Sequence, residues 1–127
     1  MKEYNLILIK SKQFALRIIK LYKYLCEQKK EYILSKQIVR SGTSIGANAK
    51  EASVAQSKAD FYAKLSISLK EAAETEFWLE TLHESEYIDD KQFESINADC
   101  TELLKILTSI LKTREKKKLF IINYKLI

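Results

Sequence analysis

Residues 33–56 read ILSKQIVRSGTSIGANAKEASVAQ, and this stretch decides the fold. Its apolar residues recur at the spacing that places side chains on one face of an α-helix. Those residues are Leu34, Ile38, Ile45, Ala49 and Ala52. The pattern predicts a long helix with one buried face.

One side of the same stretch carries only small side chains. Its small residues there are Ser41, Gly42, Gly46, Ala49 and Ser53. Two glycines four residues apart stack along a helix and let another backbone come close, so we expect close helix packing at Gly42, Gly46 and Ala49. A second interpretation is a break, in which Gly42 ends one helix and Ser44 caps the next. Because each glycine inside a helix costs about 1 kcal/mol relative to alanine, the residues alone leave both interpretations open.

Three further segments flank this stretch and carry helical spacing of their own. They run from about Leu6 to Lys29, from about Ser57 to Ser85, and from Asp89 or Asp90 to about Arg114. Ser57 and Asp60 fit a capping box at the start of the second of these segments. Links of a few residues make consecutive helices antiparallel neighbours. We therefore predict an all-α, antiparallel up-down four-helix bundle.

Length and composition agree with this prediction. The 127 residues include no proline and only two glycines, whereas sandwiches and barrels need many turns rich in both. A chain of this length is expected to form a single domain. We assign residues 1–115 to the bundle and residues 116–127 to a basic and apolar tail, which extends the last helix, packs on a neighbouring subunit or frays.

Cysteine usage and hydropathy point to a cytoplasmic protein. Cys26 and Cys100 stand alone, without a metal-binding spacing or a disulfide framework. No apolar run approaches the roughly 20 residues of a membrane helix, and none resembles a signal peptide. We predict no association with a membrane.

Charge is divided into blocks along the chain. Residues 1–50 carry eleven Lys or Arg and three Glu, whereas residues 51–100 carry four Lys and twelve Asp or Glu. Residues 101–127 are basic again, with seven Lys or Arg and two Glu. A basic surface favours a polyanion such as nucleic acid, and a basic block beside an acidic block of the same chain favours self-association.

The clearest candidate surface is the basic face of the first segment. The candidate nucleic-acid-binding residues are Lys12, Arg17, Lys20, Lys23 and Lys30. Tyr4, Tyr24, Tyr32 and Tyr124 are candidates for stacking on bases. Repeated around an oligomer, such a face becomes a strong polyanion surface, because each neutralised phosphate releases counterions. The alternative is an assembly scaffold or protein-interaction module without a nucleic-acid role.

Two groups of polar residues are candidates for structural or interaction roles. A polar row along the second helix and carboxylates on the third predict a partly buried ion-pair network, in which Arg40 reaches Glu71 or Glu74. Its members are Arg40, Ser44, Asn48, Glu51, Glu71 and Glu74. The row of Glu76, Glu80 and Glu84 is either a solvated face or a face that meets basic residues of another helix or subunit.

No constellation for catalysis is present in the sequence. Glu80 and His83 have the Glu-x-x-His spacing of di-iron bundles, but such sites need two of these motifs and the chain has one histidine. No phosphate-binding loop, nucleophile elbow or zinc-protease motif occurs. We predict a protein that is not an enzyme and that has no catalytic residue, metal site or cofactor.

A resemblance emerges from the middle of the chain. Gln37–Asn48, with Glu51-Ala52 and Ser57–Phe61, resembles the signature of the 23S ribosomal RNA intervening-sequence protein family, also called the four-helix bundle proteins. The stretch Lys70–Leu79 continues this similarity, which spans some forty residues of mixed chemistry.

The resemblance to this family carries expectations about fold, assembly and partners. It implies a four-helix bundle in which Gly42 and Gly46 lie inside one continuous helix. It also implies a relation to the accessory variability determinant of diversity-generating retroelements, a basic homopentamer that binds nucleic acid and partners a reverse transcriptase. We therefore expect a homo-oligomer, a pentamer by analogy, that binds RNA or DNA with little sequence selectivity.

Overall fold

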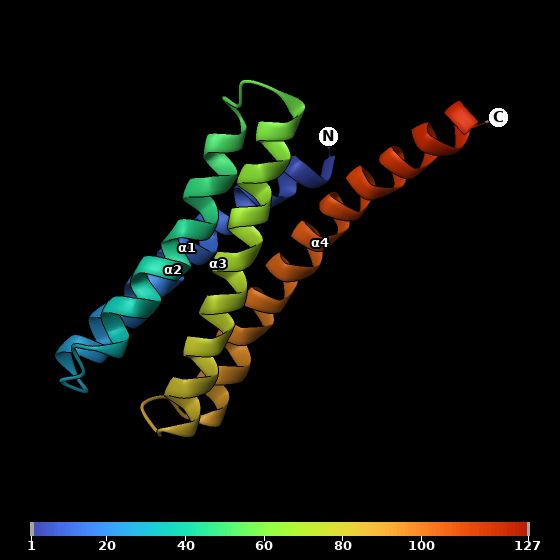
Figure 1. Ribbon diagram of the computed structural model, residues 1–127. Helices are drawn as coiled ribbons and strands as arrows, with labels where there is room; N and C mark the ends of the chain where they lie inside the picture. Colours follow the sequence, from blue (N-terminus) through green and yellow to red (C-terminus); the bar gives the residue numbers. More distant parts are fainter. Residues whose placement is uncertain (1, 127) are drawn as a thin grey trace.

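The computed structural model describes the backbone of residues 2–126 and the side chains of residues 2–114. Over this range the chain forms the helices α1 (Lys2–Glu27), α2 (Leu34–Ala52), α3 (Lys58–Glu84) and α4 (Asp90–Leu126). Each helix runs antiparallel to the one before it (Figure 1). The predicted up-down four-helix bundle is confirmed.

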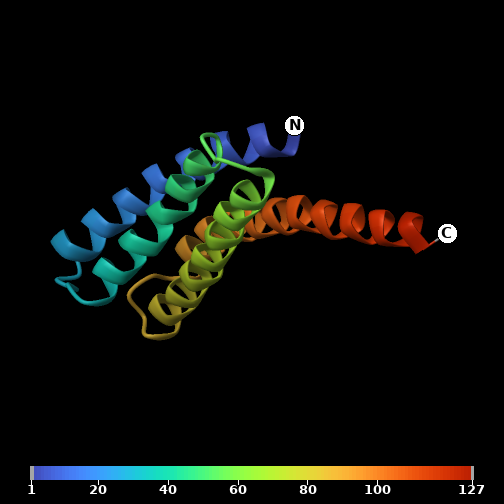
Figure 2. The same ribbon diagram turned by 45° about the horizontal axis from the view of Figure 1, so that its top comes forward.

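Each helix packs against two neighbours, so the remaining side of every helix points outward. The packed pairs are α1 with α2, α2 with α3, α3 with α4, and α1 with α4. Figure 2 shows α1 beside α2 and α3 beside α4. Because α1 and α3 are diagonal, their outer faces point in opposite directions. The largest fully buried side chains are Ile7, Phe14, Ile18, Leu25, Ile38, Ile45, Leu65, Leu79, Leu82, Leu103, Leu107 and Ile110.

Helix α2 is continuous through both glycines, so the alternative of a break at Gly42 is wrong. Neither glycine has a positive φ. A Cβ atom on Gly42 would lie 2.8 Å from Cγ1 and Cγ2 of Ile18, and one on Gly46 would lie 3.3 Å from the backbone oxygen of Ser11. Ala49, on the same side, is fully buried. The small residues of α2 therefore face α1, whose backbone lies close to Gly46.

Small hydroxyl side chains also lie between α2 and α3. Ser68 donates to the backbone oxygen of Ile45 at 2.8 Å, and Thr75 donates to Oγ of Ser41 at 3.0 Å. Ser41, Ser68 and Thr75 are fully buried. Because buried polar groups are costly unless they are hydrogen-bonded, these contacts satisfy the hydroxyls inside an otherwise apolar core.

Helix starts follow local capping chemistry. The Ser57 side chain accepts a hydrogen bond from the Asp60 N–H at 3.0 Å, as predicted for the start of α3. Asp89 and Gln92 exchange the two bonds of a capping box before α4. Helix α2 is capped by a residue that we did not predict: the buried Glu31 carboxylate accepts from the Ser35 N–H at 2.8 Å.

The predicted helix ends differ from the observed ones by a few residues, except at the end of α4. Helix α1 begins at Lys2 rather than Leu6, and α2 ends at Ala52 rather than Gln56. Helix α4 was expected to end near Arg114 but continues to Leu126, beyond the ends of the other helices (Figure 1). Of the expectations for the tail, extension of the last helix is the one that this backbone matches; its side chains lie outside the described residues.

Candidate nucleic-acid interface

The outer face of α1 carries the free cations of the predicted surface. Lys12, Lys20 and Lys23 are exposed, and none of them makes an ion pair within residues 2–114. They are exposed because the other side of α1 holds the buried stripe of Ile7, Phe14 and Ile18. Their ammonium groups are therefore available to an external anion.

Arg17 is different, because its guanidinium group is held by α4. It donates to the Asp99 carboxylate at 2.6 Å, to Oγ of Ser95 at 3.0 Å and to the Ser95 backbone oxygen at 3.3 Å. The predicted role of Arg17 in binding nucleic acid stays a prediction, and these bonds show that its charge is shared with α4. Arg17 reaches sideways to α4, since it lies at the edge of the outer face rather than at its centre.

A groove of about 500 Å³ lies between α1 and α4 and brings basic and polar side chains together. Arg17 and Lys20 enter it from α1, and Lys91 enters it from α4. Tyr24, Gln92 and Ser95 add an aromatic ring and hydrogen-bonding groups. The sequence analysis missed Lys91, because this residue belongs to an acidic stretch of the chain and becomes part of a basic groove only through packing.

Lys12 lines a second groove, on the other side of α1. This groove has a volume of about 590 Å³ and lies between α1 and α2. Its apolar lining comes from Leu8, Ala15, Leu16, Ile19, Gly46 and Ala47. Lys12 and Lys50 also line it, one from each helix. The two grooves flank α1, and the α1–α4 groove is lined by three basic residues on a floor that includes Leu21, Ile88 and Ile96.

The outer face of α1 is also more apolar than expected. Ile9 is 58% exposed and Leu16 is 53% exposed, and both lie among the lysines. The predicted basic face therefore also carries two large apolar side chains, which the prediction did not include. Exposed apolar side chains of this size are a feature of surfaces that contact other proteins.

The remaining predicted basic residue, Lys30, lies in the turn between α1 and α2. Its backbone has a φ of 53°, in the left-handed region. Lys30 does not line either groove. The five predicted residues thus do not form one patch: they are divided between two grooves, the exposed end of α1 and this turn.

The four tyrosines proposed for base stacking have different surroundings. The Tyr4 hydroxyl donates to the Ala49 backbone oxygen at 2.8 Å and the ring packs on Phe61, and burial raises the pKa of this phenol. Tyr4 is therefore part of the helix packing. Tyr24 lines the α1–α4 groove, and Tyr32 is exposed in the turn after α1. Tyr124 lies outside the described side chains.

The polar network around Arg40 lies on the surface between α2 and α3. Arg40 pairs with Glu71 at 3.2 Å and also with Glu74, and the Trp78 indole N–H donates to Glu74 at 2.9 Å. These bonds from Trp78 and Arg40 lower the pKa of the Glu74 carboxyl. The predicted pairing of Arg40 with Glu71 and Glu74 is confirmed. Glu71 is 20% exposed and the Arg40 side chain is 49% exposed, so the guanidinium group lies at the solvent edge of the network.

The other predicted members of this network bond elsewhere. The Ser44 hydroxyl donates to the Arg40 backbone oxygen at 2.6 Å, and the Asn48 amide donates to the Ser44 backbone oxygen at 2.9 Å. Glu51 pairs with Lys64 at 3.7 Å. Hydroxyl and amide groups on a helix readily bond to the preceding turn, so Ser44 and Asn48 leave the guanidinium group to the two carboxylates.

Comparison with known proteins supplies the family. The family model described as "23S rRNA-intervening sequence protein" matches residues 3–109. The chain belongs to this family. The match includes α1 from Glu3 onward, all of α2 and α3, and the part of α4 that lines the α1–α4 groove.

A solved structure from the 23S rRNA-intervening sequence protein family has nearly the same fold. It is the crystal structure of a protein of unknown function from the S23 ribosomal protein family of Bacteroides thetaiotaomicron VPI-5482. The sequences are 58% identical over 87% of this chain and 98% of that chain, with a TM-score of 0.85. The comparison with curated proteins found no match. The relation to diversity-generating retroelement proteins stays a prediction.

Two further findings concern metal binding and membrane-spanning helices. Within the described residues, no group of three or more His, Cys, Asp or Glu side chains is placed to hold a metal ion. His83 instead bonds to Asp90 at 2.7 Å and stacks on Phe93. None of the described helices is long and apolar enough to cross a membrane.

Proposed function

We propose that this member of the 23S rRNA-intervening sequence protein family is a non-enzymatic homo-oligomer that binds RNA or DNA. The α1–α4 groove is the observation that carries the proposal, because Arg17, Lys20 and Lys91 converge on it from two helices. Contacts of this kind are made to phosphates and carry little sequence information. The binding is therefore weakly selective for sequence.

The groove offers distinct roles to its residues. Lys20 and Lys91 are exposed and provide the mobile charges that neutralise phosphates. Arg17 is held in place by Asp99, so part of its charge is already compensated and it fixes the shape of the groove. Tyr24 presents a ring on which an unpaired base can stack.

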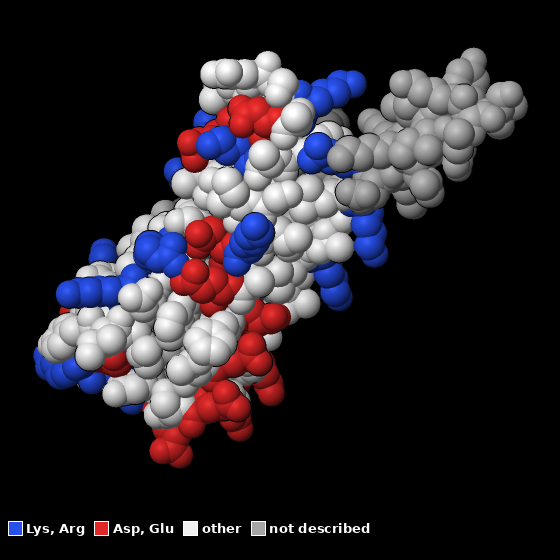
Figure 3. All heavy atoms as spheres, in the orientation of Figure 1, with Lys and Arg blue, Asp and Glu red and all other residues white. Residues whose placement is uncertain are grey.

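Charge at the end of the bundle limits the path of a bound strand. Glu84, Glu86, Asp89 and Asp90 line a cavity at the α3–α4 turn, next to Tyr24. Figure 3 shows that acidic side chains gather at this end of the molecule. A phosphate backbone is repelled there, so we expect the strand to leave the groove away from this end and to cross α1 toward Lys12 on its other side.

Oligomerisation increases the number of phosphate contacts that the protein can make. One copy offers a few phosphate contacts, whereas several copies around one axis offer the same contacts repeatedly, with a gain in avidity. A homopentamer is the assembly that we propose by resemblance. A reverse transcriptase as partner stays a prediction that no observation here favours.

The test is binding of labelled RNA and labelled duplex DNA over a series of salt concentrations. The variant carries Lys20→Glu and Lys91→Glu, and it leaves Arg17 in place because Arg17 links α1 to α4. The matched control carries Lys36→Glu and Lys58→Glu, two exposed lysines outside the groove with the same change in net charge.

Wild-type affinity should fall steeply with salt. The groove variant should lose about tenfold or more at low salt, and its salt slope should fall by about 2, one for each lost phosphate contact. The control should keep the wild-type slope. Equal losses in both variants would show that net charge alone decides binding, and absence of wild-type binding at low salt would remove the proposed function.

One observation favours the alternative function of an assembly scaffold. The exposed Ile9 and Leu16 and the apolar α1–α2 groove are better suited to another protein surface than to phosphates. A scaffold without a nucleic-acid role predicts that the oligomer changes with salt while neither RNA nor DNA binds. The oligomeric state and nucleic-acid binding can both be measured on the same samples.

A further inference from the structure

The floor of the α1–α4 groove is apolar, although its rim is basic. Leu21, Ile88 and Ile96 line it, and the two isoleucines are nearly fully buried. A phosphate gains nothing from such a floor, because a charged group stays hydrated beside apolar side chains. The flat face of a nucleobase, in contrast, is readily buried on apolar and aromatic side chains. Phosphate contacts alone therefore leave the floor of the groove without a role.

The residues of the groove follow a fixed order along the bundle. The Arg17 guanidinium group bonds to Ser95, so these two residues share one end of the groove. Tyr24 is seven residues beyond Arg17, and Ile88 is seven residues before Ser95. Because α1 and α4 are antiparallel, Tyr24 and Ile88 share the other end. A rise of about 1.5 Å per residue separates the two ends by about 10 Å, a span that suits a single nucleotide from its phosphate to its base.

The Arg17 end of the groove keeps hydrogen-bond donors for a phosphate. Three of the five N–H donors of the guanidinium group make the bonds to Asp99 and Ser95, so two remain within the described part of the chain. The Ser95 hydroxyl accepts from Arg17, which leaves its own O–H to donate. Lys20 and Lys91 are exposed and line the groove between its two ends, one from each helix. This part of the groove is therefore suited to a phosphate group.

The Tyr24 end presents an aromatic ring and an amide group. Tyr24 is half-buried and lines both the groove and the acidic cavity at the α3–α4 turn. Lys29, which lines that cavity and not the groove, places its ammonium group 6.0 Å from the centre of the Tyr24 ring. The Gln92 amide oxygen accepts from the Asp89 N–H at 2.9 Å, so the Gln92 NH2 group is left to donate to a carbonyl oxygen of a base. The groove lining at this end is uncharged and is suited to a base.

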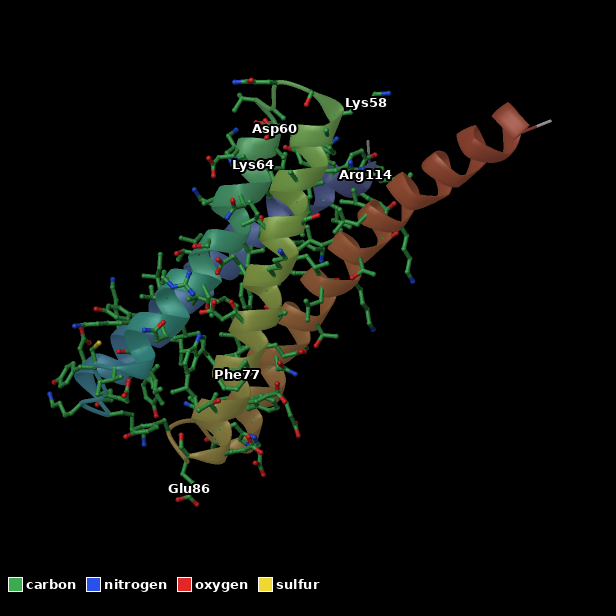
Figure 4. All side chains as sticks on the ribbon, viewed as in Figure 1. Lys58, Asp60, Lys64, Phe77, Glu86 and Arg114 are labelled. Atoms are coloured by element: carbon green, nitrogen blue, oxygen red, sulfur yellow. The ribbon has the colours of Figure 1, made fainter. Side chains whose placement is uncertain are left out.

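Carboxylates beyond Tyr24 prevent a phosphate from passing this end. Glu84, Asp89 and Asp90 line the acidic cavity, together with Glu86, which Figure 4 labels at the turn between α3 and α4. A nucleobase is neutral and can lie beside these groups, whereas the next phosphate of a strand is repelled by them. A strand that places a base on Tyr24 therefore turns its backbone away from this end.

We propose that the α1–α4 groove binds one unpaired nucleotide of a single strand, with its base stacked on Tyr24 and its phosphate held by Lys20 and Lys91. The inference rests on the nucleic-acid binding proposed above and adds the class of ligand, a single strand rather than a duplex. The bases of a duplex are paired and stacked on one another, so a duplex reaches this groove only with its phosphates. It would leave the apolar floor and the Tyr24 ring uncovered.

The test compares the affinities of three labelled ligands at low salt. They are a single-stranded DNA oligonucleotide that cannot pair with itself, the same strand with a stable abasic sugar at every position, and the duplex of the first strand. The two single strands carry the same charge, and the duplex carries more charge per unit length, so binding by charge alone favours the duplex. The base-bearing strand should bind about fivefold or more tightly than the abasic strand, and more tightly than the duplex.

Variants of Tyr24 assign the preference to the groove. Tyr24→Leu removes the ring and should weaken binding of the base-bearing strand about fivefold or more, with no change for the abasic strand. Its salt slope should stay at the wild-type value, because no phosphate contact is lost. Tyr24→Phe keeps a ring and should retain the wild-type affinity. The matched control is Tyr32→Leu, at a tyrosine that is 53% exposed in the turn after α1 and does not line the groove. Circular dichroism checks the fold of each variant.

Three results would overturn the inference and leave the proposed function in place. They are equal affinity for the base-bearing and abasic strands, tighter binding of the duplex, and a Tyr24→Leu variant that binds both single strands as the wild type does or loses affinity for both equally. Absence of binding to all of the ligands at low salt would instead remove the proposed function together with the inference. If Tyr24→Leu does not fold, the comparison of base-bearing and abasic strands on the wild type still decides.

Discussion

Where α1 meets α2, the backbone oxygen of Ser11 is within 3.3 Å of the point where a Cβ on Gly46 would lie, and no ion pair joins the two helices within the described residues. Where α1 meets α4, Arg17 pairs with Asp99 at 2.6 Å and Lys10 pairs with Glu102 at 2.8 Å. The first interface is determined by the small size of its residues, and the second by charges at its margin. The two should therefore respond to different perturbations.

The largest effect is expected from Gly42→Ala. The new Cβ would lie 2.8 Å from two atoms of the fully buried Ile18, so α1 or Ile18 must shift. Overpacking of a core costs about 1–3 kcal/mol, and alanine regains up to about 1 kcal/mol of helix propensity. Because the crowded atoms belong to a fully buried, β-branched side chain, the cost should lie at the upper end of this range. We therefore expect a net loss of about 2 kcal/mol in the free energy of unfolding, measured by urea denaturation.

A matched variant separates crowding from helix propensity. Ala47→Gly changes an exposed position of the same helix and should cost about 1 kcal/mol through propensity alone. The Gly42→Ala loss should be the same in low and high salt, since no charge is involved. If Gly42→Ala stabilised the protein instead, α1 and α2 would not be as tightly packed as this interface requires.

A smaller and salt-dependent effect is expected from Arg17→Ala at the α1–α4 interface. The Arg17 and Asp99 side chains are both about four-tenths exposed or more, so solvent screens their attraction. Together with the lost bonds to Ser95, the variant should cost about 1 kcal/mol at low salt. The cost should shrink in high salt, where the Debye length falls to about 3 Å.

A double-mutant cycle with Asp99→Asn isolates the pair. If the ion pair carries the effect, Arg17→Ala should cost less in the Asp99→Asn background than in the wild type. An equal cost in both backgrounds would assign the effect to the Ser95 contacts instead.

The contrast between the two interfaces also separates what the sequence predicted from what it did not. The small residues around Gly42 and Gly46 were visible as a local pattern, but the residues alone left a break at Gly42 open, and the family resemblance was needed to imply one continuous helix. Pairing of Arg40 with Glu71 and Glu74 followed from assuming that α2 and α3 are antiparallel neighbours. Neither inference needed the position of α4.

The groove residues Lys50 and Lys91 were not predicted, because each completes a site begun on a different helix. The bonds from Arg17 to α4 were not predicted for the same reason: its partner Asp99 lies 82 residues further along the chain. How far the Arg40 guanidinium group reaches into solvent could not be predicted, since periodicity gives the face of a helix and not the depth of a long side chain. A guanidinium group at the end of such a side chain reaches solvent even when its Cβ points toward a neighbouring helix.

The smallest effect is expected from Arg40→Ala, between α2 and α3. Because the guanidinium group is half exposed, its pairing with Glu71 and Glu74 should contribute about 0.5 kcal/mol, well below the roughly 3 kcal/mol expected for a buried pair that loses one partner. Trp78 still donates to Glu74 in this variant, which limits the loss further. The difference should therefore be small but measurable by urea denaturation near neutral pH.

The pH dependence of that difference identifies its source. The folded-state pKa of Glu74 is lowered by its bonds from Trp78 and Arg40, so the stabilisation is present above the unfolded-state pKa and is lost as pH falls through the folded-state value. Wild type and Arg40→Ala should thus differ at pH 7 and converge in acid, below the usual pKa range of a glutamate. Glu74→Gln is the control, because its amide cannot titrate and its stability should vary less over this range. A difference that persists unchanged into acid would show that packing of the arginine stem on α3, rather than its charge, joins α2 to α3 at this point.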